Sequence, residues 1–387
     1  MIKSRFSSDF ELAILGGGQL GKMLLYETRK WDVKTRVLDP SEEAPCRMSA
    51  NRFTVGDLMD FDTVLHFARG ADVVTIEIEH VNTDALLQLQ REGVAVYPPP
   101  QALAIIQNKV AQKKHYAEHG LPTARFEVFS DATSVREAVD SGRWVLPAVW
   151  KAATGGYDGK GVRILHSMDD VLDLPHTECL LEEKVKFVHE LGVIVARSES
   201  RGEHQTYTPV EMDFHPEANL VEFVISPARV DATIEKRARE IAIRAADSFH
   251  MTGLLAVELF LLEDGTVLIN EVAPRPHNSG HLTIEGHYTN QFEQHLRAIL
   301  DLPLGSTAQK CPAVMVNIVG AEGYSGMVNY EGVESLLQIP GVTPHIYGKK
   351  ETRPWRKMGH ITCVADSLED ALHSAEIANN TIRVTNL

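Results

Sequence analysis

The sequence predicts an α/β protein with more than one domain, and three observations support this class. The first part of the chain alternates short apolar runs with helical patterns, as in a parallel sheet covered by helices. A chain of 387 residues is long enough for roughly two or three domains that each bury a core. Its hydrophobic fraction of 44% and charged fraction of 24% are typical of a globular protein, which excludes the disordered and fibrous classes.

The amino-terminal elements are predicted from this alternation. The predicted strands lie at 11–15, 33–39 and 71–80, and the predicted helices at 23–29, 61–69 and 83–92. The run Tyr97-Pro98-Pro99-Pro100 interrupts the pattern, because proline lacks the amide hydrogen that strands and helix interiors need. We therefore expect a domain boundary close to this run.

The rest of the chain is expected to mix strands and helices. A basic helix over 104–119 should end at Gly120, ahead of Pro122. Further helices are predicted at 232–250 and 368–379, and strands at 145–152, 162–167, 178–185, 189–198, 254–262 and 266–272. A last segment from Ala313 mixes strands with glycine and proline turns.

Charge and cysteine content narrow the function classes. With 38 basic against 53 acidic residues the formal net charge is −15, and such a field repels nucleic acid and acidic lipid. The four cysteines form no CxxC pair, which argues against a disulfide framework or zinc knuckle and favours a reducing compartment. No apolar run reaches the ~18–20 residues of a membrane span, and no secretory signal is recognisable. We expect a cytoplasmic enzyme or binding protein.

A glycine-rich turn, Gly16–Gly21, stands between the first predicted strand and the first predicted helix. It fits the pattern GxGxxG, whose amides can approach a phosphate at a helix N-terminus. Asp39 ends the next strand, where a dinucleotide site would carry an acid. Three interpretations stay open: a nicotinamide-cofactor site, another phosphate or substrate contact, and a turn that binds nothing.

A second glycine-rich segment, Thr154–Gly161, joins two predicted strands and contains four glycines in seven residues. Ordering so many glycines costs backbone entropy, which is understandable if the loop closes over a ligand with its amides inward. Lys151, at the end of the preceding strand, can reach phosphate oxygens. The alternative is a mobile hairpin tip.

Glu258 and Glu271, in the predicted hairpin at 254–272, are the candidate metal ligands. If Asp264-Gly265 forms a two-residue turn, counting back along both strands places Glu258 opposite Glu271. Facing carboxylates destabilise a sheet unless a cation lies between them, and Mg²⁺ takes one or two carboxylates plus substrate oxygens. Mn²⁺ could substitute. Asn270 would project from the other face of an ideal strand, and the alternative interpretation is a pair of ordinary surface acids.

The segment Ala273–His281, with the sequence APRPHNSGH, follows directly. Its side chains Arg275, His277 and Asn278 offer a cation, an imidazole and an amide, a suitable set for a small planar oxyanion. The HxxxH spacing could suggest zinc, but the HExxH glutamate is missing and the prolines oppose a helix.

The segment Lys349–Lys357 contains five basic residues in an acidic chain. A run of charge is usually a solvated face. Because Pro354 and a following strand argue for a fixed loop, we expect this segment to clamp a phosphomonoester.

Taken together, these motifs resemble the ATP-grasp superfamily, and within it the 5-(carboxyamino)imidazole ribonucleotide synthase family of purine biosynthesis. The resemblance runs over nearly the whole chain, in the order GGGQLG, TIEIEHV, QNKVAQK, KAATGGYDGKG, LLEEKV, VLINEVAPRPHNSGH, QFEQHLRAILDLPL and RKMGHI. The combination of TGGYDGKG with NEVAPRPHNSGH is the most specific part of it.

The resemblance implies an ATP-grasp fold with three parts. These are an N-terminal parallel-sheet pre-ATP-grasp domain at 1–103, a small central lid domain at 104–190, and a C-terminal mixed-sheet domain at 191–387 with a terminal subdomain from about 312. It also implies a carbon–nitrogen ligase that uses ATP and bicarbonate to carboxylate the exocyclic amine of 5-aminoimidazole ribonucleotide, through carboxyphosphate, with release of ADP and phosphate. A homodimer, and a product passed to a separate mutase, are implied as well.

The resemblance also assigns residues to this chemistry. Those implied to hold ATP are Lys109, Lys151, Gly156, Tyr157, Asp158, Gly159, Lys160, Gly161, Val162, Glu182, Glu183, Lys184, Val185, Glu190, His215, Asn270 and Glu271. Those implied to hold the ribonucleotide or bicarbonate are Gln19, Glu77, Tyr157, Asp158, Arg275, His277, Asn278, Lys349 and Arg356. Glu258 and Glu271 would hold Mg²⁺, and Asp158 would help to deprotonate the amine.

Three other functions remain open on the sequence. The first is another ATP-grasp ligase, such as a formate-dependent glycinamide ribonucleotide transformylase. The second is a nicotinamide-dependent oxidoreductase built on Gly16–Gly21, and the third is a nucleotide-sensing module without turnover.

Overall fold

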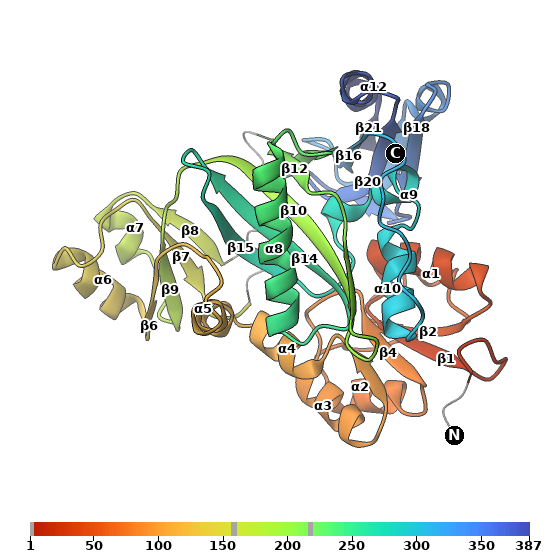
Figure 1. The fold of residues 1–387 in the computed structure, drawn as a ribbon, viewed down its shortest axis with the longest axis horizontal. Helices are drawn as coiled ribbons and strands as arrows, with labels where there is room; N and C mark the ends of the chain where they lie inside the picture. The colour runs from red at the N-terminus through yellow and green to blue at the C-terminus, as the bar shows by residue number, and fades with distance from the viewer. Residues whose placement is uncertain (1–3, 156–160, 216–219) are drawn as a thin grey trace.

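The computed structural model describes residues 4–155, 161–215 and 220–387, and Figure 1 shows their arrangement. The described strands form four sheets, of five, four, nine and three strands. The five-stranded and four-stranded sheets lie at opposite sides of the molecule, and the first strands of the nine-stranded sheet run between them. No helix within these ranges has both the length and the apolar character needed to cross a membrane.

The amino-terminal sheet confirms the predicted parallel arrangement, with the strand order β3-β2-β1-β4-β5. Its elements are β1 Glu11–Leu15, α1 Gln19–Lys30, β2 Lys34–Asp39, β3 Arg52–Val55, α2 Phe61–Ala68, β4 Val73–Ile76, α3 Thr83–Arg91 and β5 Ala95–Tyr97. Only β3 and β5 lie where no strand was predicted. The strand order reverses between β1 and β4, and in such sheets ligands gather at the carboxyl ends of the strands beside the reversal.

The predicted basic helix over 104–119 is wrong in one respect, because the structure has two helices there. α4 Pro100–Ile106 ends before Asn108, and α5 Lys109–Glu118 begins after it. The Asn108 side chain accepts a hydrogen bond from an amide in the first turn of α5, as asparagine commonly does at a helix start. The break makes Lys109 the first residue of α5.

The four-stranded sheet is antiparallel and has the order β6-β9-β7-β8. Its elements are β6 Phe126–Phe129, α6 Ala132–Asp140, β7 Ala148–Ala152, β8 Val162–Leu165, α7 Met168–Leu172 and β9 Cys179–Glu183. Helices α6 and α7 share an apolar core with the strands. The β7–β8 hairpin carries the second glycine-rich segment, of which residues 156–160 lie outside the described part of the chain.

The nine-stranded sheet has the order β15-β14-β10-β12-β13-β16-β20-β18, with β11 paired to β10. Every strand pairing in it is antiparallel, whereas the resemblance implied a mixed sheet. The reason is that many of its strands follow one another through short turns, which join antiparallel neighbours. Its strands are β10 Phe187–Ser198, β11 Glu203–Thr206, β12 Val210–Phe214, β13 Val221–Ser226, β14 Gly253–Leu262, β15 Val267–Ala273, β16 Ala313–Val319, β18 Val342–Ile346 and β20 Lys357–Val364.

Helices cover this sheet, and a small sheet completes the carboxyl-terminal end. Helix α8 packs across β10, β14 and β15, as Figure 1 shows, and shares a core with Leu255 and Val257. Because side chains alternate along a strand, Glu258 belongs to the opposite face. The other elements are α8 Ala232–Ser248, η1 Asn278–Gly280, α9 Thr283–Gly286, α10 Gln291–Ile299, β17 Gly326–Glu331, α11 Val333–Leu336, β19 Glu351–Thr352, α12 Leu368–Thr381 and β21 Arg383–Asn386.

The β14–β15 hairpin pairs Glu258 with Glu271 as predicted, but not through the predicted two-residue turn. A three-residue loop joins the strands, since the Leu262 amide bonds to the Thr266 carbonyl. The pairing near the turn is therefore one residue out of the predicted register. A β-bulge beside Glu258 restores it, and Asn270 is the extra residue of β15.

Candidate active site

The candidate site lies where the four-stranded sheet meets the β14–β15 hairpin. Lys151 Nζ, on β7, lies 3.4 Å from Asn270 Oδ1, and Lys109 Nζ, at the start of α5, lies 2.8 Å from Glu271 Oε2. Asn270 and Glu271 are neighbours in sequence, so an ideal strand would turn them to opposite faces. The bulge removes this restriction and allows both side chains to meet the same group of charges.

Seven ionisable side chains gather at this seam, and we call them the charged cluster. They are Lys109, Lys113, Lys151, Glu182, Glu190, Glu258 and Glu271. Burying charges is unfavourable unless they are paired, and four members of the cluster are less than a tenth exposed. Because the cluster has one more carboxylate than ammonium group, a further cation would complete its charge balance.

Glu182, near the end of β9, bridges two lysines. Its Oε1 lies 3.0 Å from Lys113 Nζ and its Oε2 lies 3.0 Å from Lys151 Nζ. Burial opposes ionisation of this carboxyl, but the two ammonium groups hold its pKa below the ordinary value. Among the residues from Glu182 to Val185, which the resemblance implies to hold ATP, the exposed carboxylate is that of Glu183.

Lys113 is the member of the cluster that sequence reasoning missed. It lies four residues after Lys109 on α5, so the two side chains share one face of the helix, and this spacing was the available signal. Burial lowers the pKa of Lys113 to about 8, although Glu182 opposes the shift. Lys113 also donates to Thr123 Oγ1, which donates to the Ile269 carbonyl beside the bulge.

The three remaining acids hold their protons unequally. Burial, followed by repulsion from Glu271 and Glu190, raises the pKa of Glu258 well above the ordinary value. Burial and Glu271 raise the pKa of Glu190 to about 7. Burial acts in the same direction at Glu271, but Lys109 overcomes it and lowers that pKa to about 2. Full ionisation of all three carboxyls therefore requires another positive charge.

The facing pair Glu258 and Glu271 fits a divalent cation, because a cation would relieve their repulsion. Within residues 4–155, 161–215 and 220–387, no three histidine, cysteine or acidic side chains are arranged to hold a metal ion. The pair would thus supply only part of a coordination shell. Oxygen atoms of a bound ligand and of water would complete it, which is the usual arrangement for Mg²⁺.

His277 lies at the edge of the charged cluster. Its Nε2 is 3.3 Å from Glu258 Oε1, and its Nδ1 accepts a hydrogen bond from the Ser279 amide at 3.3 Å. Burial, with Arg275 next in size, lowers the pKa of His277 to about 3, so the imidazole is neutral at physiological pH. Since Nδ1 accepts, the ring proton is assigned to Nε2, which faces Glu258.

Arg275 and Asn278, the other predicted residues of this segment, are held by different parts of the fold. Arg275 Nε lies 2.8 Å from Glu79 Oε2, in the segment after β4 of the amino-terminal sheet. Asn278 and Asn317, on β16, exchange two side-chain hydrogen bonds of 2.9 and 3.1 Å. The segment therefore joins three regions of the chain.

The glycine-rich turn at 16–21 is filled by an internal carboxylate. Glu77 accepts hydrogen bonds from the amides of Gly18 and Gly21 at 3.0 and 3.1 Å, and Asp39 accepts one from Gly17. A Cβ atom at Gly18 would lie 2.6 Å from Glu77 Oε1. The amides that a dinucleotide phosphate would need are thus already bonded, so the turn has a structural role and the oxidoreductase interpretation loses its support.

The basic segment Lys349–Lys357 is tied to the amino-terminal domain. Lys22, on α1, donates to two main-chain carbonyls directly before it, at 3.0 and 3.2 Å. Within the segment, the side chains of Lys349 and Arg356 each donate to a main-chain carbonyl, at 2.7 and 2.6 Å. These bonds hold parts of the loop in place, while Lys350, Glu351 and Arg353 within it are exposed to solvent.

Gln19 and His215 lie outside the charged cluster. Gln19 begins α1 beside the glycine-rich turn. The ring centroid of His215 lies 4.9 Å from that of Trp355, so this predicted ATP residue contacts the basic segment. His215 also follows Phe214, which lines the pocket described next.

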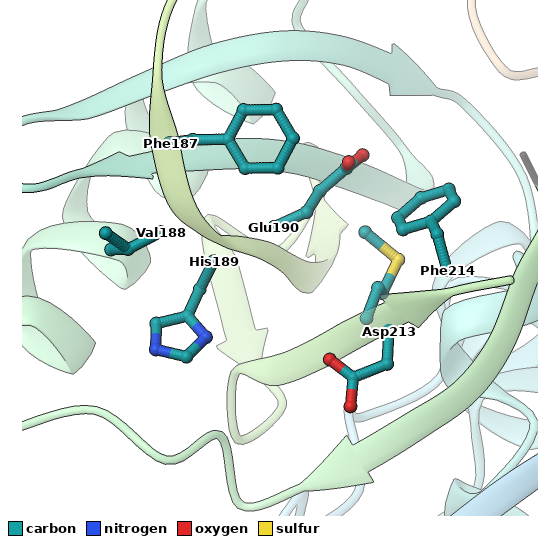
Figure 2. Close-up of a pocket in the computed structure, with 7 residues that line it drawn as sticks. Phe187, Val188, His189, Glu190, Asp213 and Phe214 are labelled. Carbon is teal, nitrogen blue, oxygen red and sulfur yellow. The ribbon is translucent and has the colours of Figure 1, made fainter. Parts of the chain in front are cut away.

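A pocket of about 280 Å³ opens beside the cluster, on β10 and β12 (Figure 2). Glu190 points between the rings of Phe187 and Phe214, while His189 and Asp213 project from the other side of the strands. The full lining is Phe187, Val188, His189, Glu190, Met212, Asp213 and Phe214. The two phenylalanine rings with the Glu190 carboxylate between them suit a nucleoside, because the base can stack and the ribose hydroxyls can donate.

Five residues of the predicted site fall between the described ranges. Gly156, Tyr157, Asp158, Gly159 and Lys160 lie outside the described residues. The flanking residue Gly161 accepts a hydrogen bond from the Ala152 amide at 2.9 Å, and Val162 begins β8. The segment thus begins after β7, the strand that also carries Lys151, and ends at β8.

The sequence matches three family models in chain order. They are a ribonucleotide synthetase preATP-grasp domain at residues 10–107, an ATP-grasp domain at 114–292 and a phosphoribosylaminoimidazole carboxylase C-terminal domain at 313–374. Of the strands described above, all except β21 lie within these ranges.

Relatives of known function are similar over the same extent. The N5-carboxyaminoimidazole ribonucleotide synthase of Bacillus subtilis is 39% identical, over 91% of this chain and 90% of its own length. The crystal structure of the N5-carboxyaminoimidazole ribonucleotide synthetase from Thermotoga maritima superposes with a TM-score of 0.89, at 40% identity, and covers 98% of this chain and 100% of its own. The N5-carboxyaminoimidazole synthase from Aspergillus clavatus, in complex with ADP and 5-aminoimidazole ribonucleotide, gives a TM-score of 0.87 at 34% identity, over 98% and 99% of the two chains.

Proposed function

Because the chain belongs to the N5-carboxyaminoimidazole ribonucleotide synthase family of ATP-grasp enzymes, we propose that it is the ligase that carboxylates the exocyclic amine of 5-aminoimidazole ribonucleotide in purine biosynthesis. The substrates are the ribonucleotide, ATP and bicarbonate, and the products are the carbamate, ADP and phosphate. One observation carries the proposal for this chain: the bulge on β15 brings Glu258, Glu271, Lys109 and Lys151 to one seam between two sheets. Such a seam can hold a triphosphate and a cation together.

ATP binding follows from the pocket and the charged cluster. The pocket beside Glu190 holds the nucleoside, and the Glu190 carboxylate accepts hydrogen bonds from the ribose hydroxyls. Lys109 and Lys151 then stabilise the phosphates at the seam, as ammonium groups commonly do. Glu182 and Lys113 act behind them, since Glu182 fixes Lys151 by the 3.0 Å ion pair.

Glu258 and Glu271 hold Mg²⁺ in this proposal, and Mn²⁺ could replace it. A bound divalent ion would supply charge stabilisation for the transferring phosphoryl group. The protein's own contribution is to keep two carboxylates facing each other across the hairpin, with Asn270 and Lys151 beside them.

Bicarbonate binds to Arg275, His277 and Asn278. One of its oxygens attacks the γ-phosphorus of ATP, the bond to the bridging oxygen breaks, and ADP leaves. The resulting carboxyphosphate breaks down to CO₂ and phosphate, and the ribonucleotide amine adds to CO₂ and loses a proton. Water must be excluded because carboxyphosphate hydrolyses readily, and the segment from Thr154 to Gly161 is expected to close over the site.

The ribonucleotide is proposed to lie between the amino-terminal sheet and the basic segment. Lys349 and Arg356 bind its phosphate, and Tyr157 and Asp158 contact the imidazole end, where Asp158 helps to remove the amine proton. Gln19, at the start of α1, and Glu77, which bonds to the turn before α1, are proposed to contact the ribonucleotide as well. The fixed conformation of the basic segment supports this placement, because a preorganised clamp binds a phosphate with less loss of entropy.

The domain limits at residues 103, 190 and about 312, the homodimer and the separate mutase that consumes the product belong to the same proposal. The family models, which end at 107, 292 and 374, support a division into three consecutive parts.

The proposal is tested by measuring ADP release with each substrate omitted in turn. We expect release to require both bicarbonate and the ribonucleotide, and label from ¹³C-bicarbonate to appear in an acid-labile carbamate. Turnover with formate and glycinamide ribonucleotide in their place would favour the transformylase alternative. ADP release that is indifferent to the ribonucleotide would contradict the proposed reaction.

A further inference from the structure

His277 belongs to a stretch of main chain that pairs with no strand in the described part of the chain. β15 ends at Ala273 and η1 begins at Asn278, so η1 engages the His277 carbonyl, through the Gly280 amide, but not the His277 amide. His277 is nevertheless partly buried, and its position decides where the imidazole meets the rest of the site. Buried peptide groups need partners, and here a side chain supplies them.

That side chain is Gln291, the first residue of α10, which is fully buried. Its Oε1 accepts a hydrogen bond from the His277 amide at 2.9 Å, and its Nε2 donates to the His277 carbonyl at 2.8 Å. The primary amide thus pairs with both main-chain groups of His277, as the facing residue of a neighbouring strand would. The carbonyl of His277 also accepts a bond from the Gly280 amide.

The Gln291 side chain is itself fixed from several directions. Its Nε2 lies 3.1 Å from Nδ1 of His281, which burial keeps neutral and therefore able to accept. Its main-chain amide donates to Thr283 Oγ1 at 2.9 Å. A Cβ atom at Gly280 would lie 2.5 Å from Gln291 Oε1, so only glycine there leaves room for the amide. The contact is therefore specific in both distance and shape.

We propose that Gln291 is a positioning residue for bicarbonate, which holds the His277 main chain so that the imidazole and its neighbours Arg275 and Asn278 meet the anion in one geometry. This inference rests on the function proposed above. Gln291 contacts no substrate in it, and acts only through His277.

Helix α10 also contains a matched control. Gln294 is equally buried, and it makes the same pair of bonds to a different main chain: its Nε2 donates to the Gly305 carbonyl at 2.9 Å and its Oε1 accepts from the Gly305 amide at 2.8 Å. Among the described residues, neither Gln294 nor Gly305 hydrogen-bonds to a group that we assign to a substrate. A change at either glutamine removes the same two bonds from the same helix.

The test compares Q291M with Q294M, because methionine is similar in length to glutamine and lacks the amide. For Q291M we expect the KM for bicarbonate to rise about tenfold, the effect of losing roughly one hydrogen bond, while the KM for ATP changes less than about twofold. Because each change removes the same two hydrogen bonds, Q291M and Q294M should lower the thermal unfolding midpoint by similar amounts. Q294M should leave the KM for bicarbonate as in the wild type. Equal bicarbonate KM values in the two variants would show that Gln291 serves stability alone and would overturn the proposal.

Q291N provides the second variant, since it keeps the amide but shortens the side chain. It should fold and show a smaller rise in the same KM. If neither Gln291 variant folds while Q294M does, the contact is required for the fold and the proposal for bicarbonate is overturned. Wild-type protein is measured first: ADP release that does not depend on bicarbonate refutes the proposed function itself, and the inference with it, whereas normal wild-type turnover leaves the variants to decide on Gln291 alone.

Discussion

Glu190 links the stability of this protein to the function of its site. Burial and Glu271 raise the pKa of its carboxyl from 4.5 to about 7 in the folded protein. The folded state therefore binds this proton more tightly than the unfolded chain does. The free energy of unfolding contributed by Glu190 must fall as pH rises from about 4.5 to about 7, and stay low above that.

The magnitude follows from the same shift. At 1.36 kcal/mol per pKa unit, a rise from 4.5 to about 7 corresponds to about 3 kcal/mol, an upper limit for the penalty of ionising Glu190. The variant E190Q cannot ionise, and its amide can still bond to Asn270. We therefore expect E190Q to be more stable than the wild type by up to about 3 kcal/mol at pH 8, and by much less at pH 5.

Urea unfolding of both proteins at pH 5 and pH 8 measures this difference, and E376Q, at an exposed position on α12, is the control for removing any carboxylate. The more stable variant should bind ATP more weakly, by about tenfold, because an amide is a poorer acceptor for the ribose hydroxyls. A stability difference that is the same at both pH values would refute the reasoning, since it could not come from the titration of Glu190.

Three further substitutions test other parts of the site. E271Q removes the partner of Lys109 and one proposed metal ligand, so ADP release should fall at least about 100-fold with an unchanged circular dichroism spectrum; full activity would contradict the metal assignment. The wild type is expected to gain stability between pH 8 and about 10, because the folded pKa of about 8 for Lys113 lies below that of the unfolded chain, and K113M should lose this gain in urea titrations; identical pH profiles would speak against a buried Lys113. G18A places a Cβ atom 2.6 Å from Glu77 Oε1 and should lower the free energy of unfolding by about 1–3 kcal/mol, and an unchanged urea midpoint would mean that Glu77 does not fill the turn.

The β14–β15 hairpin shows how a local pattern can lead to the right contact by the wrong route. The Asp-Gly pair predicted a two-residue turn, and the counting placed Glu258 opposite Glu271. The structure has a three-residue loop and a bulge, and the two deviations cancel at this pair. A bulge adds one residue without changing the apolar pattern that identifies a strand, so the sequence alone does not reveal it. Strand geometry therefore placed Asn270 on the other face, and only the family resemblance placed it with the nucleotide; the bulge brings it beside Lys151.

Other parts of the site could be predicted from the sequence to different degrees. Asn108 is a common helix-capping residue, and with it the break between α4 and α5 could have been predicted, together with Lys113 on the face of Lys109. The residues that contact the segment Ala273–His281 could not be predicted in this way. Glu79 and Asn317 come from distant regions of the chain, and only the packing of separate parts of the fold brings them to the segment. Gln291 lies only 14 residues after His277, but its contact depends on how helix α10 packs back against the segment.

The pairing of charges at the seam explains why ATP and a divalent cation should bind together. In this structure Lys109 pairs with Glu271 and Lys151 pairs with Glu182. A triphosphate that attracts Lys109 would weaken the interaction that holds Glu271 ionised, and so would leave the Glu271 carboxylate facing Glu258 with less compensation. A cation held by the two carboxylates, as proposed above, would remove that penalty and would also neutralise phosphate charge. Lys109 would thus compensate the charge of Glu271 until the nucleotide binds Lys109, and each of the two ligands would make the binding of the other more favourable.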